Sequence, residues 1–292
     1  MNSTNPIHIL RLSCLFLLLG LPAACNLPQA SPPPAPYVAT LNPTLSPTLS
    51  ATSQPSATPA LSNVQDMIDR CPTTAEIASV DADLTLGFDG DPTAGTLICR
   101  AADGSSDLTL LQLRAYQVLL VMQRLEFNQP LPWTDLSLYG WFTSNIDSIR
   151  FRNDVQYSSC CNPPGTMNLV TGLFALETDR WLQAEDPDVN VQGLMVLMIH
   201  EARHSEGYYH TCGTARDQTI AETGAYGVQY WTYVWLAYHS DPTFMTPGGS
   251  NPDLYREINR DMAARYLKAR DEGAGPFCKE ATLTPGPTPT IP

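Results

Sequence analysis

The chain has 292 residues, of which 43% are hydrophobic and 9% aromatic, so it can bury one sizeable core. Its formal net charge is −13 at pH 7, and it therefore lacks the positive field that attracts the phosphates of nucleic acids. We expect a single domain of the size of an enzyme, with no nucleic acid as partner.

An export signal is predicted for residues 1–25. The apolar run from Leu12 to Leu21 is too short to span a bilayer as a mature helix, and small residues follow it, directly before Cys25. This ending resembles the lipobox of bacterial lipoproteins, although Pro22 stands where that motif usually has Leu. The resemblance implies an extracytoplasmic protein anchored to the cell membrane by a lipid on Cys25. A secretory signal cut nearby is the alternative.

Two segments have the composition of disordered chain. Residues 26–61 are rich in Pro, Ser, Thr and Ala and have almost no charge, so they cannot bury enough surface to offset the loss of chain entropy. Residues 281–292 repeat this composition. We therefore expect a linker at 26–61, a folded domain at 62–280 and a loose tail at 281–292.

Hydrophobic periodicity predicts several helices and two short strands in the folded domain. The segment 191–206 is apolar nearly all round in its first half, so we expect a buried helix that ends at Gly207. Further helices are expected at 106–127 with a Ser106 cap, at 217–239, and from Asn251-Pro252-Asp253 onward, and strands at 148–152 and 167–171. This set of elements predicts an α+β domain.

Six cysteines remain in the folded domain, an even number that suits disulfide bonds in an oxidising compartment. We predict a local bridge between Cys71 and Cys99. Adjacent cysteines rarely pair because of their geometry, so Cys160 and Cys161 are expected to join one loop to two different segments. No Cys-x-x-Cys pair is present, which disfavours a thiolate zinc site. The six candidates are Cys71, Cys99, Cys160, Cys161, Cys212 and Cys278.

Residues 200–210 contain three of the five histidines in the chain. On a helix, His200 and His204 share a face and can direct two imidazoles at one metal ion. Glu201 projects about 100° around the axis and can reach a metal-bound water without being a ligand. Bound Zn²⁺ lowers the pKa of its water towards ~7, and Glu201 can then act as the general base. The pattern therefore predicts a hydrolytic zinc site.

Two residues are candidates for the third zinc ligand. The pattern His-Glu-x-x-His-x-x-Gly-x-x-His resembles the metzincin signature of the zincin metallopeptidases. That resemblance implies His210 as the third ligand, and Met245 as the candidate for the methionine turn beneath the metal. The gluzincins instead take a Glu from a later helix, at a distance comparable to that from His204 to Glu222. The signature is formed by His200, Glu201, His204, Gly207 and His210.

The resemblance to zincins also implies a fold and further site residues. The fold is a small mixed sheet packed on a buried active-site helix, followed by C-terminal helices. Tyr208 and Tyr226 are candidate oxyanion donors, because tyrosines have this role in some zincins; aromatic packing is the alternative for each.

We therefore expect an exported zinc metallopeptidase, an endopeptidase or related amidase, that acts on a peptide or protein substrate. Two other hypotheses remain. One is a catalytically silent zincin-fold lipoprotein that binds partners at the cell surface. The other is a disulfide-braced structural lipoprotein without a metal.

Overall fold

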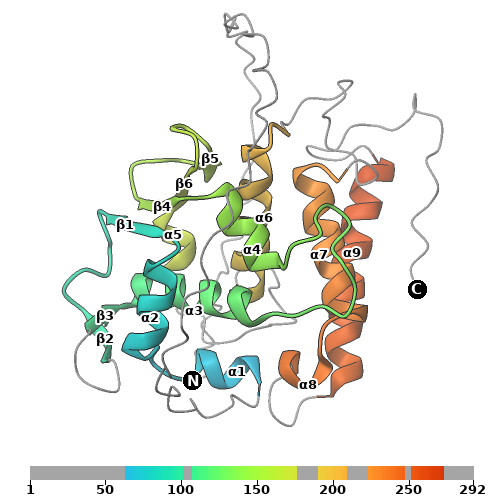
Figure 1. The fold of residues 1–292 in the computed structure, drawn as a ribbon, viewed down its shortest axis with the longest axis horizontal. Coiled ribbons are helices and arrows are strands. Elements are labelled where there is room, and N and C mark those ends of the chain that lie inside the picture. Colours follow the sequence, from blue (N-terminus) through green and yellow to red (C-terminus); the bar gives the residue numbers. More distant parts are fainter. Residues whose placement is uncertain (1–62, 101–106, 176–189, 209–222, 247–250, 273–292) are drawn as a thin grey trace, which may run out of the picture. The chain divides into compact units, whose positions relative to one another are not determined.

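The computed structural model describes residues 63–100, 107–175, 190–208, 223–246 and 251–272, which all belong to one compact unit, Ser56–Pro292 (Figure 1). The predicted export signal, the Cys25 lipid site, the linker and the tail lie outside these residues. The described part combines small sheets with several helices, so the expected α+β class is confirmed. None of its helices is both long enough and apolar enough to cross a membrane.

The main sheet has four strands in the order β1-β4-β6-β5. Strands β1, β4 and β6 run parallel to one another, and β5 runs antiparallel to β6, so the sheet is mixed. The strands predicted at 148–152 and 167–171 are confirmed as β4 and, shifted by one residue, β6. The strands are β1 Thr85–Asp89, β4 Ser148–Arg152, β5 Ser159–Cys160 and β6 Thr166–Val170. A second sheet pairs β2 Leu97–Arg100 with β3 Asp107–Thr109 in antiparallel fashion.

Helix α3 (Leu110–Arg124) is the helix predicted at 106–127. Its cap is Thr109 and not the predicted Ser106, because β3 continues up to Thr109. The hydroxyl of Thr109 accepts from the Gln112 N–H at 3.3 Å, and the Gln112 side chain accepts from the Thr109 N–H at 2.9 Å. This reciprocal pair provides hydrogen-bond acceptors for two N–H groups that have no acceptor within the helix.

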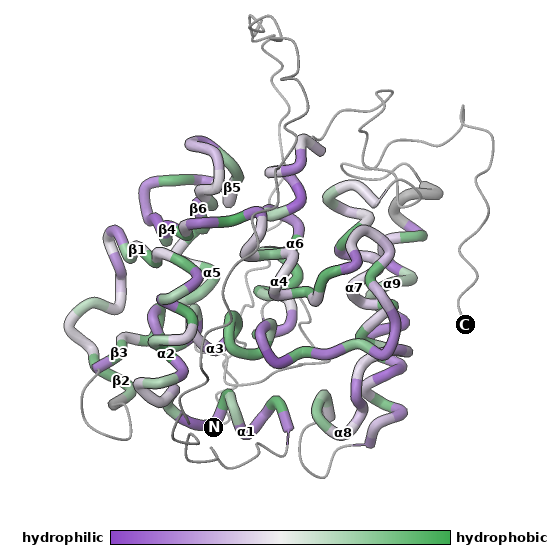
Figure 2. The backbone as a smooth tube through the Cα atoms, viewed as in Figure 1, coloured by the Kyte–Doolittle hydropathy of each residue, from purple (hydrophilic) through white to green (hydrophobic). Residues whose placement is uncertain are grey.

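Helix α6 (Val191–Ser205) lies at the centre of the domain, between the main sheet and the pair α7 (Ala225–Tyr238) and α9 (Pro252–Glu272) (Figure 1). It packs against α3, α7 and β5. Figure 2 shows long hydrophilic stretches on α9, which covers the outer side of α7. The remaining helices are α1 Val64–Ile68, α2 Thr74–Asp81, α4 Leu138–Asn145, α5 Thr171–Phe174 and α8 Pro242–Met245.

Two of the three remaining predicted helices are confirmed in position. Helix α6 ends at Ser205, and Gly207 has a φ of 82°, the left-handed conformation that glycine adopts without strain. Helix α9 begins after Asn251, whose side chain accepts from the Asp253 N–H at 2.9 Å. The helix predicted at 217–239 begins only at Ala225, with Gly224 as its cap, so its predicted start was too early.

The disulfide between Cys71 and Cys99 is confirmed, with Cα atoms 5.6 Å apart. The other pairing differs from expectation. Cys160 and Cys161 are joined to each other, at the edge strand β5, with Cα atoms 3.2 Å apart. This pairing differs from the expectation that the two residues join one loop to two different segments. Cys212 and Cys278 lie outside the described residues.

A buried carboxylate, Glu76, joins α2 to its surroundings. Arg70 donates two hydrogen bonds to it, at 2.7 and 2.6 Å, and Arg124 also contacts it from α3. Burial alone would raise the pKa of Glu76. The hydrogen bonds from Arg70 and from the Thr73 N–H, together with the two arginine charges, outweigh burial and lower this pKa from 4.5 to about 2.

We expect Glu76→Gln to lower the free energy of unfolding near neutral pH by about 3 kcal/mol. The folded-state pKa lies below the unfolded value, so this stabilisation is present above pH 4.5 and is lost as the pH falls towards 2. Urea unfolding of both proteins across this range measures the difference. A difference that does not shrink in acid would contradict the assignment.

Candidate metal centre and cleft

The two predicted zinc ligands on α6 lie together in the structure. Asn190 caps this helix by accepting from the Gly193 N–H at 2.8 Å, and nearly every residue of the helix before Ser205 is buried. The spacing of four residues places the rings of His200 and His204 edge to face, with centroids 4.9 Å apart. Two imidazoles at this distance can converge on one ion.

A backbone contact orients the ring of His204. Its Nδ1 lies within hydrogen-bond distance of the carbonyl oxygen of Tyr208, just beyond the end of α6. A carbonyl can only accept, so Nδ1 carries the hydrogen and Nε2 keeps its lone pair. Burial lowers the pKa of His204, although this hydrogen bond raises it in part, so the neutral ring is favoured. A neutral imidazole whose second nitrogen donates to a carbonyl is the form found in zinc sites.

Glu201 lies between the histidines in sequence and is 6% exposed. Burial raises its pKa from 4.5 to about 7. A carboxyl group with a pKa near neutrality is suited to accept a proton and return it later. Its position on a buried helix therefore matches the role of a general base.

The two candidate oxyanion donors have different surroundings. Tyr226 lies in the first turn of α7, and its ring contacts that of His200 with centroids 4.6 Å apart. Burial raises the pKa of Tyr226, and the nearby charge of Glu201 adds to this effect. Tyr208 instead stacks against Arg203, whose guanidinium carbon is 4.0 Å from the ring centroid. The structure therefore brings Tyr226, and not the Tyr208 ring, to the side of His200 and Glu201.

A cleft of ≈450 Å³ lies beside this group. Its volume falls in the usual range of ligand pockets. His200 and Glu201 form part of its wall, whereas His204 does not. The lining residues come from the chain around β5, from β6 and α5, and from α6 and α7: Gln156, Tyr157, Ser158, Val170, Leu173, Leu197, His200, Glu201, Tyr226 and Gln229.

Of the residues that line this cleft, the sequence predicted only His200, Glu201 and Tyr226 as site residues. Gln229, among the residues that were missed, is 8% exposed, and its buried Oε1 has no hydrogen-bond partner within the described part of the chain. Its spacing of three from Tyr226, in an otherwise apolar helix, was a usable signal. Tyr157 is 66% exposed at the cleft, and no pattern in the sequence distinguishes it.

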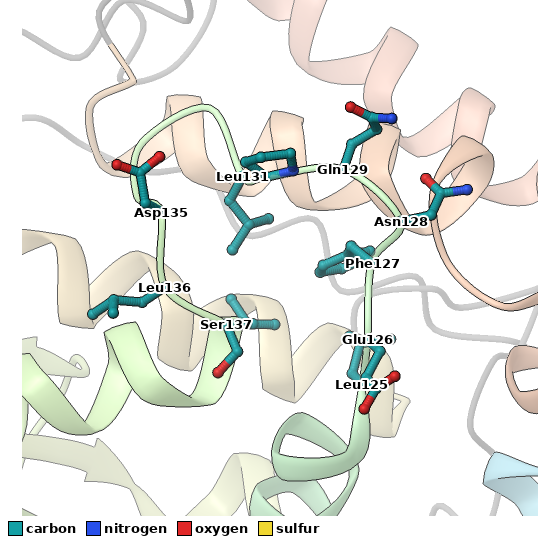
Figure 3. Close-up of a pocket in the computed structure, with 11 residues that line it drawn as sticks. Leu125, Glu126, Phe127, Asn128, Gln129, Leu131, Asp135, Leu136 and Ser137 are labelled. Carbon is teal, nitrogen blue, oxygen red and sulfur yellow. The ribbon is translucent and has the colours of Figure 1, made fainter.

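A second cavity, also of ≈450 Å³, is lined by the segment 125–138 that joins α3 to α4. Figure 3 shows Phe127 and Leu131 directed into the ring formed by this segment. Its ionisable lining residues are Glu126 and Asp135, and none of the predicted site residues reaches it. The cleft beside α6 is therefore the candidate site.

Met245 is not near the two histidines. It ends α8, which follows the C-terminal end of α7, while Tyr226 lies in the first turn of that helix (Figure 1). The 14 residues of α7 span ~20 Å at 1.5 Å per residue. The structure therefore does not place Met245 beneath the site, because a full helix separates the two.

Both candidates for the third ligand, His210 and Glu222, lie outside the described residues. Since α7 begins at Ala225, Glu222 precedes this helix and is not part of it. Within the described ranges, no group of three His, Cys, Asp or Glu side chains is placed to hold a metal ion. The choice between the two candidates stays open.

Comparison with known proteins adds no family. No family model matches the chain. No curated protein and no solved structure matches it either.

Proposed function

We propose that this chain is an exported zinc-dependent metallopeptidase with a zincin-like domain. The observation that carries the proposal is the placement of His200 and His204 edge to face on a buried helix, with Glu201 opening into the adjoining cleft. On this helix His200 and Glu201 line the cleft, and the ring of His204 contacts that of His200 from the next turn. The same residues suit hydrolysis.

The donor set fits zinc. His204 retains its Nε2 lone pair because Nδ1 is hydrogen-bonded to the Tyr208 carbonyl, and His200 would supply a second nitrogen. His210 or Glu222 would be the third ligand. When bound, zinc would polarise the scissile carbonyl and acidify a water molecule.

The chain's own residues would divide the remaining work. Glu201 would take the proton of the attacking water and pass it to the leaving amine. The O–H of Tyr226 would donate a hydrogen bond to the oxygen of the scissile carbonyl, which becomes negative during the reaction. The side chain of Gln229 would contact the substrate backbone in the cleft, and the apolar side chains of Leu173 and Leu197 would contact an adjacent substrate side chain.

The proposed location is outside the cytoplasm. A lipid on Cys25 would anchor the chain, and residues 26–61 would hold the domain away from the membrane. The disulfide between Cys71 and Cys99 agrees with an oxidising compartment.

We expect the purified full-length chain to cleave peptides in a library of unstructured, internally quenched peptides. A zinc chelator should abolish cleavage, and about one equivalent of zinc should restore it, as in other sites with three protein ligands and an open position. Fluorescence increase and mass spectrometry of the products measure this. A chain that holds zinc but cleaves no peptide would instead favour the silent cell-surface binding lipoprotein.

A further inference from the structure

Arg203 is a buried cation beside the site that does not line the cleft. It lies on α6 directly before His204 and is 4% exposed. Its Nε donates to the carbonyl of Thr223 at 2.7 Å, and its Nη2 donates to the hydroxyl of that residue at 3.2 Å. Its Nη1 pairs with Glu206, and its guanidinium stacks on Tyr208. One side chain thus joins the end of α6 to Thr223, two residues before the start of α7.

Arg203 is linked to the ring of His204 through Tyr208. The guanidinium lies 4.0 Å from the Tyr208 ring centroid, which holds this residue against α6. The carbonyl of the same residue accepts from His204 Nδ1. Since that hydrogen bond sets the tautomer and the ring orientation, the stack controls which nitrogen of His204 is presented.

Arg203 is linked to Tyr226 through Thr223, which lies three residues before it. Thr223 has a φ of 51°, a left-handed conformation that is unfavourable for a β-branched residue. Two hydrogen bonds from Arg203 hold it in place, and three residues later Tyr226 contacts the ring of His200. The start of α7 is therefore held in position from α6.

Glu206 holds the guanidinium itself. Its carboxylate pairs with Arg203 and accepts from the indole N–H of Trp141 on α4 at 3.2 Å. A planar guanidinium can stack on one partner and donate to two others at once, which the ammonium of lysine cannot do. These contacts use both properties.

We infer that Arg203 is a positioning residue for the metal centre, which acts on His204 through Tyr208 and on Tyr226 through Thr223. The effect on zinc affinity rests on the proposed function. The inference also applies to the metal-free chain. In that chain, loss of Arg203 should release the His204 Nδ1 hydrogen bond.

The test compares Arg203→Met and Arg203→Lys with Arg124→Met, in the full-length chain. Arg124 also pairs with a buried carboxylate, Glu76, but it lies outside the site. Zinc affinity is measured by competition with a chelator, and the ring tautomer of His204 by nitrogen-15 NMR of the metal-free protein above neutral pH. Thermal unfolding of each variant reports the loss of stability.

We expect Arg203→Met to weaken zinc binding by roughly 10- to 100-fold, the usual cost of losing a group that orients a ligand. Arg203→Lys should fall between this variant and the wild type, and Arg124→Met should keep wild-type affinity despite reduced stability. The His204 Nδ1–H signal should weaken in the Arg203 variants alone. Unchanged affinity and an unchanged tautomer in Arg203→Met would overturn the inference.

Two other results would also bear on the role of Arg203: a wild type that binds no zinc, and an Arg203→Met variant that does not fold. If the wild type binds no zinc, the proposed function fails, and the tautomer alone decides the role of Arg203. If Arg203→Met does not fold, Tyr208→Leu removes only the ring on which Arg203 stacks and leaves the carbonyl in place. A shifted His204 tautomer in that variant supports the inference, and an unshifted one overturns it.

Discussion

Glu201→Gln should lower kcat/KM by about 10²- to 10⁴-fold, the range in which general bases contribute, while zinc content stays at the wild-type level. The amide has nearly the same shape as the carboxylate but cannot take a proton from water. Because Glu201 lies beside the histidines and is not predicted as a ligand, its loss should leave the metal in place. Peptide hydrolysis and metal analysis of the same sample measure both effects.

A matched control is Glu126→Gln. This residue is exposed and lines the second cavity, away from α6. The control should keep full activity. Loss of zinc in Glu201→Gln would assign this residue as a ligand, and retained activity would exclude it as the base.

The third ligand should be revealed by comparing zinc affinity in His210→Ala and Glu222→Ala. Removal of the true ligand should weaken binding by more than the roughly 100-fold that an outer group costs. Removal of the other residue should cost less than this. Competition with a chelator measures the two affinities on one scale.

The metzincin resemblance predicts the larger loss in His210→Ala. The larger loss in Glu222→Ala would place the site with the gluzincin arrangement instead. Equal retention of zinc in both variants would contradict both proposed triads, the one completed by His210 and the one completed by Glu222.

Local sequence signals predicted the central helix and its histidines well. The apolar first half of α6 and the glycine at its exit carry local information, because burial and the left-handed turn at Gly207 depend on a few neighbouring residues. Since His200 and His204 are four residues apart, their shared face follows from helix geometry alone. These features needed no tertiary contacts.

Other features depended on contacts that periodicity does not contain. Apolar spacing continues before Ala225, but the helix begins there because Thr223 is held in a left-handed conformation by Arg203, 20 residues earlier. Similarly, β3 displaced the expected Ser106 cap to Thr109 through its pairing with β2. Tertiary partners decided both boundaries.

The cleft itself was visible only in part. The sequence contains Gln229 three residues after Tyr226, but nothing local shows that this face of α7 meets Glu201. Met245 was assigned by resemblance, and the length of α7 separates it from the histidines. Assembly of the cleft depends on how α6 and α7 pack together, which no single segment specifies.

The metal content of the purified full-length chain tests whether His200 and His204 belong to a zinc site. We expect about one zinc per chain for the wild type, as in other zinc sites with three protein ligands. We also expect that His200→Ala and His204→Ala each lose the metal and remain folded. A folded wild-type chain that takes up no zinc would contradict the proposed zinc site.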